Sequence, residues 1–244
     1  ELDFRLNGHW MGEEISSTAS RKIQVKVKGK DVVDRVEILR NNQVIYRDFP
    51  IDRQTNEKSW DEPVLCRIEF GWGPWGDLNM ARICDWNFKV QVENGQVLSV
   101  TPCFQAGPYV EDKRNLVSNI TKSGCDVLSY TSRKQAYEER ATNAIILEIK
   151  GSPETIINLN LTKPDELTFS KSLKELEQSS DIFFTGEFTS ESILFHRLAF
   201  KDNYYTEFNF TDNVKSDSTD WYYARVVQTN GSLAWSSPIW VGND

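Results

Sequence analysis

The sequence predicts a mainly β protein: an antiparallel, immunoglobulin- or fibronectin-like β-sandwich with a large β insertion and one or two short helices. Three observations lead to this prediction. Apolar and polar residues alternate with period two in several segments, Asn-rich turns separate such segments, and a Tyr-x-Ala-x-Val strand followed by a hairpin lies near residue 244. Aromatic residues make up 12% and charged residues 26% of the chain, which indicates a globular protein rather than a disordered one.

The N-terminal part contains the clearest strand and hairpin. In KIQVKVKG, residues 22–29, the apolar residues Ile23, Val25 and Val27 share one face, as a half-buried strand requires. In RVEILRNNQVIYR, residues 35–47, two alternating runs flank Asn41-Asn42, and asparagine tolerates the positive φ of a tight turn. We therefore expect a strand followed by a β-hairpin.

A second hairpin is predicted at DWNFKVQVENGQVLSV, residues 85–100, because Asn94-Gly95 is a strong turn signal between alternating residues. Cys84 and Cys103 flank it. Two alternatives follow for the cysteines: one disulfide between this pair, or free buried thiols throughout. The four cysteines lack the close spacing of a zinc knuckle and are Cys66, Cys84, Cys103 and Cys125.

Other elements follow from local patterns. Ser172 and Glu175 have the spacing of a capping box, which predicts a short helix, and residues 134–141 are a second helical candidate. Polar segments with Pro or Gly predict long loops at 51–63 and 105–124. Further strands are expected at 144–149, 156–161, 182–184, 193–200 and 206–210.

The C-terminal segment WYYARVVQTNGSLAWSSPIWV, residues 221–241, is predicted to close the sandwich as a structural hairpin. Its turn is Asn230-Gly231, and Pro238 marks an edge or a bulge. We expect residues 1–50 and 215–244 to form the sandwich, with 51–214 inserted as further β structure. One continuous β domain over residues 1–244 is the alternative.

Sequence signals for catalysis are weak. No phosphate-binding glycine loop, nucleophile elbow or metal-binding histidine pattern occurs. His196 lies among apolar residues and is expected to be a partly buried, hydrogen-bonded ring. We therefore expect no catalytic, cofactor-binding or metal-binding residues. The net charge of −8 argues against nucleic-acid binding, and no apolar run is long enough for a membrane-spanning helix.

The candidate functional residues are aromatic. Trp72, Trp75 and Trp86 lie in a glycine-containing stretch, where they could form a stacking platform for sugar rings. The alternative is that they cap a sheet or fill a joint between domains. Trp10 and Met11, in a polar segment near the start, are candidates for an interdomain surface.

Four segments occur in this order along the chain: FRLNGHWMGEEI (4–15), DRVEILRNNQVIYR (34–47), LFHRLAF (194–200) and the hairpin 221–241. Together they resemble the C-terminal β region of a bacterial family of uncharacterised proteins with an N-terminal metal-dependent hydrolase domain of the polymerase-and-histidinol-phosphatase (PHP) type. The resemblance covers nearly the whole chain; the hairpin is its specific part, and residues 50–190 match loosely.

The resemblance implies a non-catalytic accessory domain whose catalytic partner, a phosphoesterase-like hydrolase, lies upstream. It implies a periplasmic or cell-surface location in a bacterium. Because the sequence begins at Glu1, we expect a fragment or a processed form. The main alternative is a carbohydrate-binding module that uses exposed tryptophans. A glycosidase or lyase on a β-sandwich is a third possibility, and it requires two convergent carboxylates in a cleft.

Overall fold

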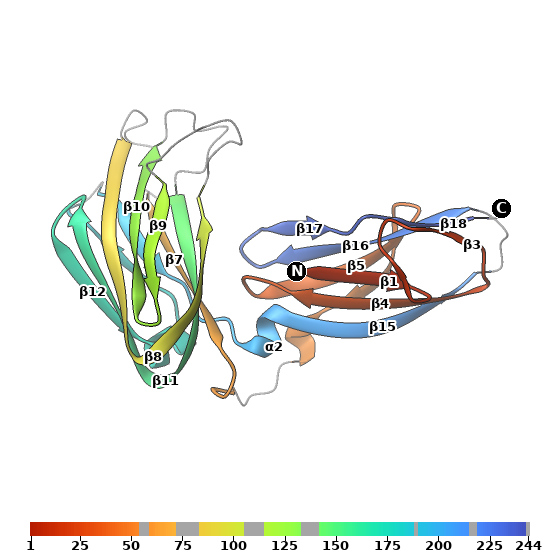
Figure 1. Ribbon diagram of the computed structural model, residues 1–244, viewed down its shortest axis with the longest axis horizontal. Coiled ribbons are helices and arrows are strands. Elements are labelled where there is room, and N and C mark those ends of the chain that lie inside the picture. Colours follow the sequence, from red (N-terminus) through yellow and green to blue (C-terminus); the bar gives the residue numbers. More distant parts are fainter. Residues whose placement is uncertain are drawn as a thin grey trace. The chain divides into compact units, whose positions relative to one another are not determined.

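The computed structural model describes residues 1–53, 59–71, 83–104, 115–132, 142–187, 190–214 and 219–242. These residues form a mainly β protein with several antiparallel sheets and two short α-helices, as predicted (Figure 1). The chain divides into two compact units: residues 1–58 with 199–244 form unit 1, and residues 59–198 form unit 2. Both ends of the chain thus contribute to unit 1.

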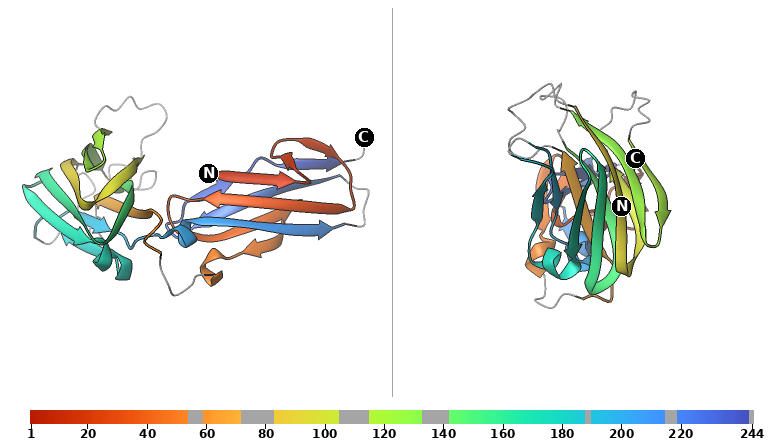
Figure 2. Two further views of the ribbon diagram at one scale, coloured as in Figure 1. Left: turned by 60° about the horizontal axis from the view of Figure 1, so that its bottom comes forward. Right: turned by 90° about the vertical axis from the view of Figure 1, so that its left-hand side faces the viewer.

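Unit 1 is a sandwich of two sheets (Figures 1 and 2). The four-stranded sheet has the order β15 (Tyr205–Asn213), β4 (Ser20–Lys28), β1 (Leu2–Leu6) and β2 (His9–Trp10). The six-stranded sheet has the order β3 (Glu14–Ser16), β18 (Ile239–Gly242), β16 (Asp220–Gln228), β5 (Val33–Arg40) and β6 (Gln43–Asp48), with β17 (Leu233–Trp235) also on β16.

The strand order is that of an immunoglobulin-like sandwich. The strands β15, β4 and β1 correspond to E-B-A, and β18, β16, β5 and β6 correspond to G-F-C-C′. Residues 199–214, expected in the insertion, belong to unit 1 because β15 pairs along the whole of β4. Between the sheets lies a core of buried residues: Phe4, Leu6, Ile23, Val25, Val27, Val33, Val36, Ile38, Tyr222, Ala224, Val226, Ile239 and Val241.

Two predicted hairpins of unit 1 are confirmed. The β5–β6 turn places Asn41 and Asn42 at φ 51° and 66°, the left-handed conformation that asparagine tolerates. In the C-terminal hairpin, Gly231 has φ 82° at the turn, and a break around Pro238 separates β17 from β18. The C-terminal segment therefore closes the sandwich, as the alternation predicted.

Unit 2 is built on one eight-stranded sheet. Its order is β13 (Asp181–Phe184), β14 (Ser192–Phe195), β7 (Val64–Gly71), β11 (Thr142–Lys163), β8 (Ile83–Cys103), β10 (Gly124–Ser132) and β9 (Leu116–Thr121), with β12 (Leu167–Ser172) paired to β11. Phe70 on β7 packs against Trp86 and Phe88 on β8, although β11 separates these strands. The sheet therefore curves so that its apolar side faces itself.

The predicted hairpin at Asn94-Gly95 is wrong. β8 continues through it and pairs with β11 on both sides, with the register shifted opposite residues 151–156. Asn94 has φ 56°, and a Cβ on Gly95 would lie 2.6 Å from Thr155 Cγ2. Asn94 and Gly95 thus form a β-bulge. Before the bulge the even-numbered residues of β8, up to Val92, are buried, and after it the next buried residue is Val97, an odd-numbered one.

The structure decides between the alternatives for the cysteines: it has no disulfide between Cys84 and Cys103, and all four cysteines are free thiols. Cys66, Cys84 and Cys125 are buried. Burial alone raises the pKa of Cys66 to about 12, which keeps this thiol protonated and unreactive.

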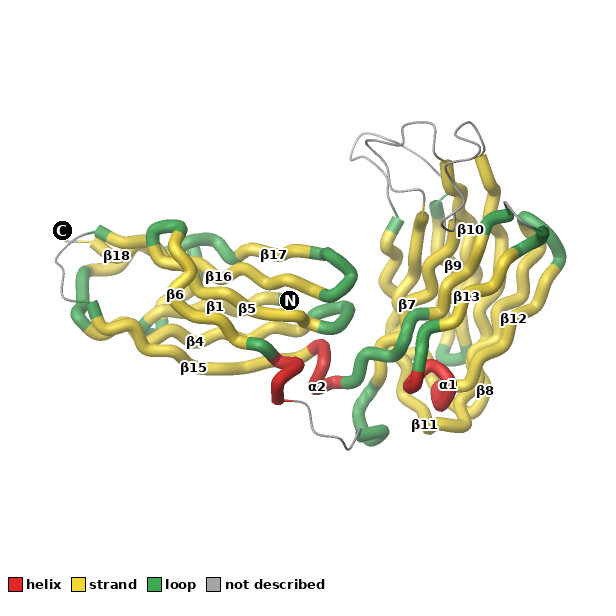
Figure 3. Tube along the Cα trace, turned by 180° about the vertical axis from the view of Figure 1, so that it is seen from behind, coloured by secondary structure: helices red, strands yellow, loops and turns green. Residues whose placement is uncertain are grey.

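The predicted helix is α1 (Leu173–Gln178), with the expected capping box between Ser172 and Glu175. Figure 3 shows it with α2 (Lys201–Tyr204) and the 3₁₀ helix η1 (Pro50–Arg53) in red. None of the helices among the described residues is long and apolar enough to cross a membrane.

Three further predictions have mixed outcomes. The expected loop 105–124 is wrong where β9 forms. The expected strand 193–200 ends at Phe195. The helical candidate 134–141 lies outside the described residues.

A buried polar network joins the two sheets of unit 1. Arg21 on β4 is fully buried, and its Nη1 donates to Asp220 on β16 and, at 2.7 Å, to the Tyr222 hydroxyl. The Tyr222 hydroxyl in turn donates to Asp212 on β15, which also accepts from Arg40 on β5. Desolvation acts to lower the pKa of Arg21, but the hydrogen bonds to Asp220 and Tyr222 outweigh it, so the guanidinium stays charged.

Replacing Arg21 with methionine leaves the buried Asp220 carboxylate without its cation. We expect Arg21→Met to lower the free energy of unfolding of unit 1 by about 3 kcal/mol or more. Lys22→Met, at an exposed position of the same strand, should change it by less than about 0.5 kcal/mol. Urea dependence of hydrogen exchange in β4 and β16 measures both, and a cost below about 1 kcal/mol for Arg21→Met contradicts the structural role.

Candidate functional site

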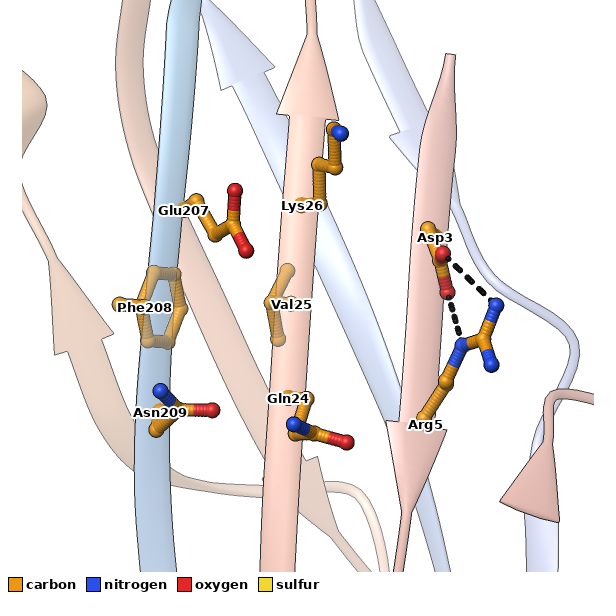
Figure 4. A pocket seen from close by; sticks show the side chains of 8 residues that line it. All are labelled: Asp3, Arg5, Gln24, Val25, Lys26, Glu207, Phe208 and Asn209. Atoms are coloured by element: carbon orange, nitrogen blue, oxygen red, sulfur yellow. Dashed lines mark hydrogen bonds and ion pairs between the residues drawn. The ribbon is translucent and has the colours of Figure 1, made fainter. Parts of the chain in front are cut away.

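A shallow pocket lies on the outer face of the four-stranded sheet of unit 1, with a volume of about 240 Å³. β1, β4 and β15 form it, and their alternation sends every second side chain away from the core. Figure 4 shows the residues that line it: Asp3, Arg5, Gln24, Val25, Lys26, Glu207, Phe208 and Asn209.

Strand register arranges the polar side chains in two rows across the sheet. In the first row, Lys26 of β4 pairs with Asp3 on one side and Glu207 on the other. In the second row, Gln24 pairs with Arg5 and Asn209 in the same way. Six polar side chains from three strands therefore share one small surface, although only neighbours on the same strand are close in sequence.

Aromatic rings flank the two rows. Trp10 on β2 pairs with Arg5 and continues the second row; the Arg5 guanidinium lies 4.5 Å from the centre of the Trp10 ring. Tyr205, on the outer face of β15, lies under the Lys26 ammonium at 5.7 Å and donates its hydroxyl hydrogen to Glu207 at 2.7 Å. Trp10 is 41% exposed, so part of its ring is open to a ligand.

The charges of the pocket balance and are only partly used within the protein. Arg5 and Asp3 form a two-pronged ion pair, with N–O distances of 3.0 and 3.3 Å. Within the described residues, no hydrogen bond engages the side-chain amides of Gln24 and Asn209. Each amide offers both a donor and an acceptor, which is the pairing that a hydroxyl group needs. The pocket thus suits a neutral ligand rich in hydroxyl groups.

The predicted site residues do not gather at one site, and they differ in how exposed they are. Trp10 lies beside the pocket, whereas Met11 is half-buried and packs against the core of unit 1, so it offers little surface. Trp86 was a candidate for a sugar-stacking platform or an interdomain surface; it is fully buried in unit 2, so it forms neither, and it donates its indole hydrogen to Thr131 at 2.8 Å. Trp72 and Trp75 lie outside the described residues.

Sequence reasoning missed the pocket residues on β1 and β15. The alternation of residues 22–29 already placed Gln24 and Lys26 on an outer face. The pairing of β4 with β1 and β15, which are far from each other in sequence, carries no local signal.

Unit 2 contains one polar cluster that involves a histidine. The His196 Nε2 lies 2.9 Å from Glu69 Oε2, so the ring is partly buried and hydrogen-bonded, as predicted. Glu69 also accepts from the Thr142 hydroxyl at 2.7 Å and lies 3.5 Å from Arg67. Because Thr142 donates to the carboxylate and not to the imidazole, the cluster lacks the hydroxyl–imidazole contact of an activated nucleophile.

The remaining histidine, His9, is exposed and lies 2.9 Å from Glu13. In the described part of the chain, no group of three or more His, Cys, Asp or Glu residues is arranged to hold a metal ion.

Comparisons with known proteins give little further information. No protein-family model matches the sequence, and no curated protein matches it. Among solved structures, the major pilin subunit of Bacillus cereus is aligned with 8% identity and a TM-score of 0.16, and the alignment covers 100% of this chain. The chain spans 66% of the pilin's length, and at this TM-score the similarity carries no structural or functional argument.

Glu69 should make the stability of unit 2 depend on pH. The His196 hydrogen bond, with smaller contributions from Thr142 and Arg67, outweighs burial and lowers the pKa of Glu69 to about 2. An unfolded glutamate has a pKa of about 4.3, so the stabilisation is complete above about pH 5 and is lost as pH falls toward 2.

We expect Glu69→Gln to cost on the order of 2 kcal/mol at pH 7 and progressively less between pH 5 and pH 2. Glu93→Gln, at an exposed position of β8, is the matched control and should show no such convergence. Hydrogen exchange in β7 and β11 across this pH range provides the measurement. A cost that stays constant down to pH 2 contradicts the assignment.

Proposed function

We propose that the chain is a non-catalytic binding module, and that the pocket on the four-stranded sheet holds a neutral carbohydrate. The observation that carries this proposal is the double row of polar side chains between Trp10 and Tyr205. Sugars combine hydroxyl groups, which require donors and acceptors together, with apolar ring faces, which stack on aromatic rings.

The size and charge of the pocket support a small neutral unit of a glycan. A volume of about 240 Å³ is just below the range of about 300–1,000 Å³ typical of pockets for drug-sized ligands, so one or two sugar rings suit it better than a large cofactor. Asp3 and Glu207 balance Arg5 and Lys26, so a charged ligand gains no net attraction there.

A binding role agrees with the accessory position that the family resemblance implies. In that setting the module would hold a glycan near a metal-dependent hydrolase domain of the same protein, at a bacterial cell surface or in the periplasm. The hydrolase partner and the location remain predictions from the resemblance alone.

The test is calorimetric titration of the protein with neutral oligosaccharides of glucose, xylose, mannose and N-acetylglucosamine. We expect at least one series to bind. Gln24→Ala and Asn209→Ala should each weaken that binding roughly five- to tenfold, the equivalent of about 1 kcal/mol for each lost hydrogen bond. Trp10→Ala should weaken it by a similar factor through the loss of ring stacking.

Lys22→Ala is the matched control, because Lys22 is exposed on the same strand as Gln24 but lies outside the pocket. Its affinity should equal that of the unaltered protein. Absence of binding to every series, or equal weakening by Lys22→Ala, overturns the proposed site. Recovery of shortened oligosaccharides after incubation overturns the non-catalytic role.

A further inference from the structure

The six-stranded sheet of unit 1 carries an aromatic outer face. On β16 the residues that alternate with the buried Tyr222, Ala224 and Val226 point outward: Trp221, Tyr223, Arg225 and Val227. Trp240 of β18 pairs with Trp221, and Trp235 of β17 pairs with Arg225. We name this surface, formed by Trp221, Tyr223, Arg225, Trp235, Trp240 and their neighbours on β3, β5 and β6, the tryptophan face.

The tryptophan face exposes large apolar rings. Trp235 is 56% and Trp240 40% exposed, and the Trp221 and Trp240 rings lie 5.4 Å apart at 39°. Tryptophan, tyrosine and arginine are the residues most enriched at the centres of protein–protein interfaces. This composition favours a protein partner over a polar small molecule.

One corner of the tryptophan face is basic. Glu37 on β5 is only 2% exposed and accepts hydrogen bonds from Arg35, Arg47 and Arg225. Burial acts to raise the pKa of Glu37, but the hydrogen bonds from Arg47 and Arg225 outweigh it, so the pKa is lowered. Three guanidinium groups thus share one carboxylate, with Asp34 as a second partner of Arg35. Arg47, on the edge strand β6, is 53% exposed.

The opposite corner is acidic. β3 forms the other edge of the sheet, and its Glu14 pairs with Trp240, which places the exposed carboxylate side chain on the outer face. The next residue, Ile15, pairs with the buried Val241 and packs against the core, as this alternation requires. Glu14 and Arg47 therefore lie on opposite edges of the sheet and at opposite ends of the tryptophan face.

We propose that the tryptophan face binds the same face of a second copy of this chain. A two-fold axis in the plane between the two faces, perpendicular to the Glu14–Arg47 diagonal, places Glu14 of each copy opposite Arg47 of the other. Both ion pairs form at once, since a two-fold interface is self-complementary. The exposed tryptophans of the two copies then cover one another between the charged corners.

The dimensions of the face indicate a weak dimer. Five strands about 4.8 Å apart and about six residues long at 3.4 Å each give roughly 500 Å² per copy, or about 1,000 Å² in total. This total lies at the lower limit for a specific interface, so we expect a dissociation constant in the micromolar range.

Sedimentation velocity of the full chain between about 1 and 500 μM tests the proposal, with a dimer forming as concentration rises. Trp235→Ala and Trp240→Ala should each weaken dimerisation at least tenfold, as expected for central tryptophans. Trp10→Ala is the matched control: it removes an exposed tryptophan from the opposite face of the sandwich and should leave dimerisation unchanged. Trp10 borders the pocket proposed to bind sugar, so Trp10→Ala should weaken sugar binding and leave dimerisation unchanged. Either proposal can therefore fail while the other holds.

A charge-reversal pair gives the sharper test. Glu14→Lys and Arg47→Glu should each weaken self-association, since each homodimer would contain two like-charge contacts. Mixing the two variants should restore a dimer, because the heterodimer has opposite charges at both corners. If Arg47→Glu disturbs the Glu37 cluster and the fold, as judged by circular dichroism, Arg47→Gln replaces it and should weaken the homodimer less. A monomer at 500 μM, or no recovery on mixing two folded charge variants, overturns the proposal.

Discussion

The buried contact of Arg21 with Asp220 and Tyr222 is the constraint on which unit 1 depends. It joins β4 of one sheet to β16 of the other, and Asp212 and Arg40 extend it to β15 and β5. A buried charge is tolerated only when its partners are in place, so the network admits one alignment of the two sheets. That alignment turns the apolar residues of both sheets inward and leaves two outer faces, which carry the pocket and the tryptophan face.

The two outer faces differ because their side chains differ in chemistry, while the backbone scaffold is the same. On the four-stranded sheet, polar side chains from three strands line a shallow pocket and include two unused amide groups. On the six-stranded sheet, tryptophan rings stand next to one another and the charged groups are largely paired within the sheet. The first face suits a hydroxyl-rich ligand, and the second suits another protein surface.

Unit 2 shows how a single bulge changes the interpretation of a sequence. Asn94-Gly95 has the composition of a hairpin turn, yet β8 passes through it because β11 supplies hydrogen-bonding partners on both sides. The close packing of Thr155 against Gly95 and Gly151 fixes the bulge and the change of buried face. A residue pair compatible with positive φ therefore indicates a local conformation, and the tertiary partner decides whether that conformation becomes a turn or a bulge.

The sequence by itself determined the mainly β class, the β5–β6 and C-terminal hairpins, and the capped helix α1, because alternation, asparagine turns and capping act between residues close in the chain. It also placed Gln24 and Lys26 on an outer face and His196 in a hydrogen-bonded setting. Only the tertiary structure decided that Trp86 is buried, that Cys84 and Cys103 are free thiols, and that Arg5, Gln24 and Asn209 form one row. These facts depend on which distant strands pair and in what register, and no local pattern specifies that.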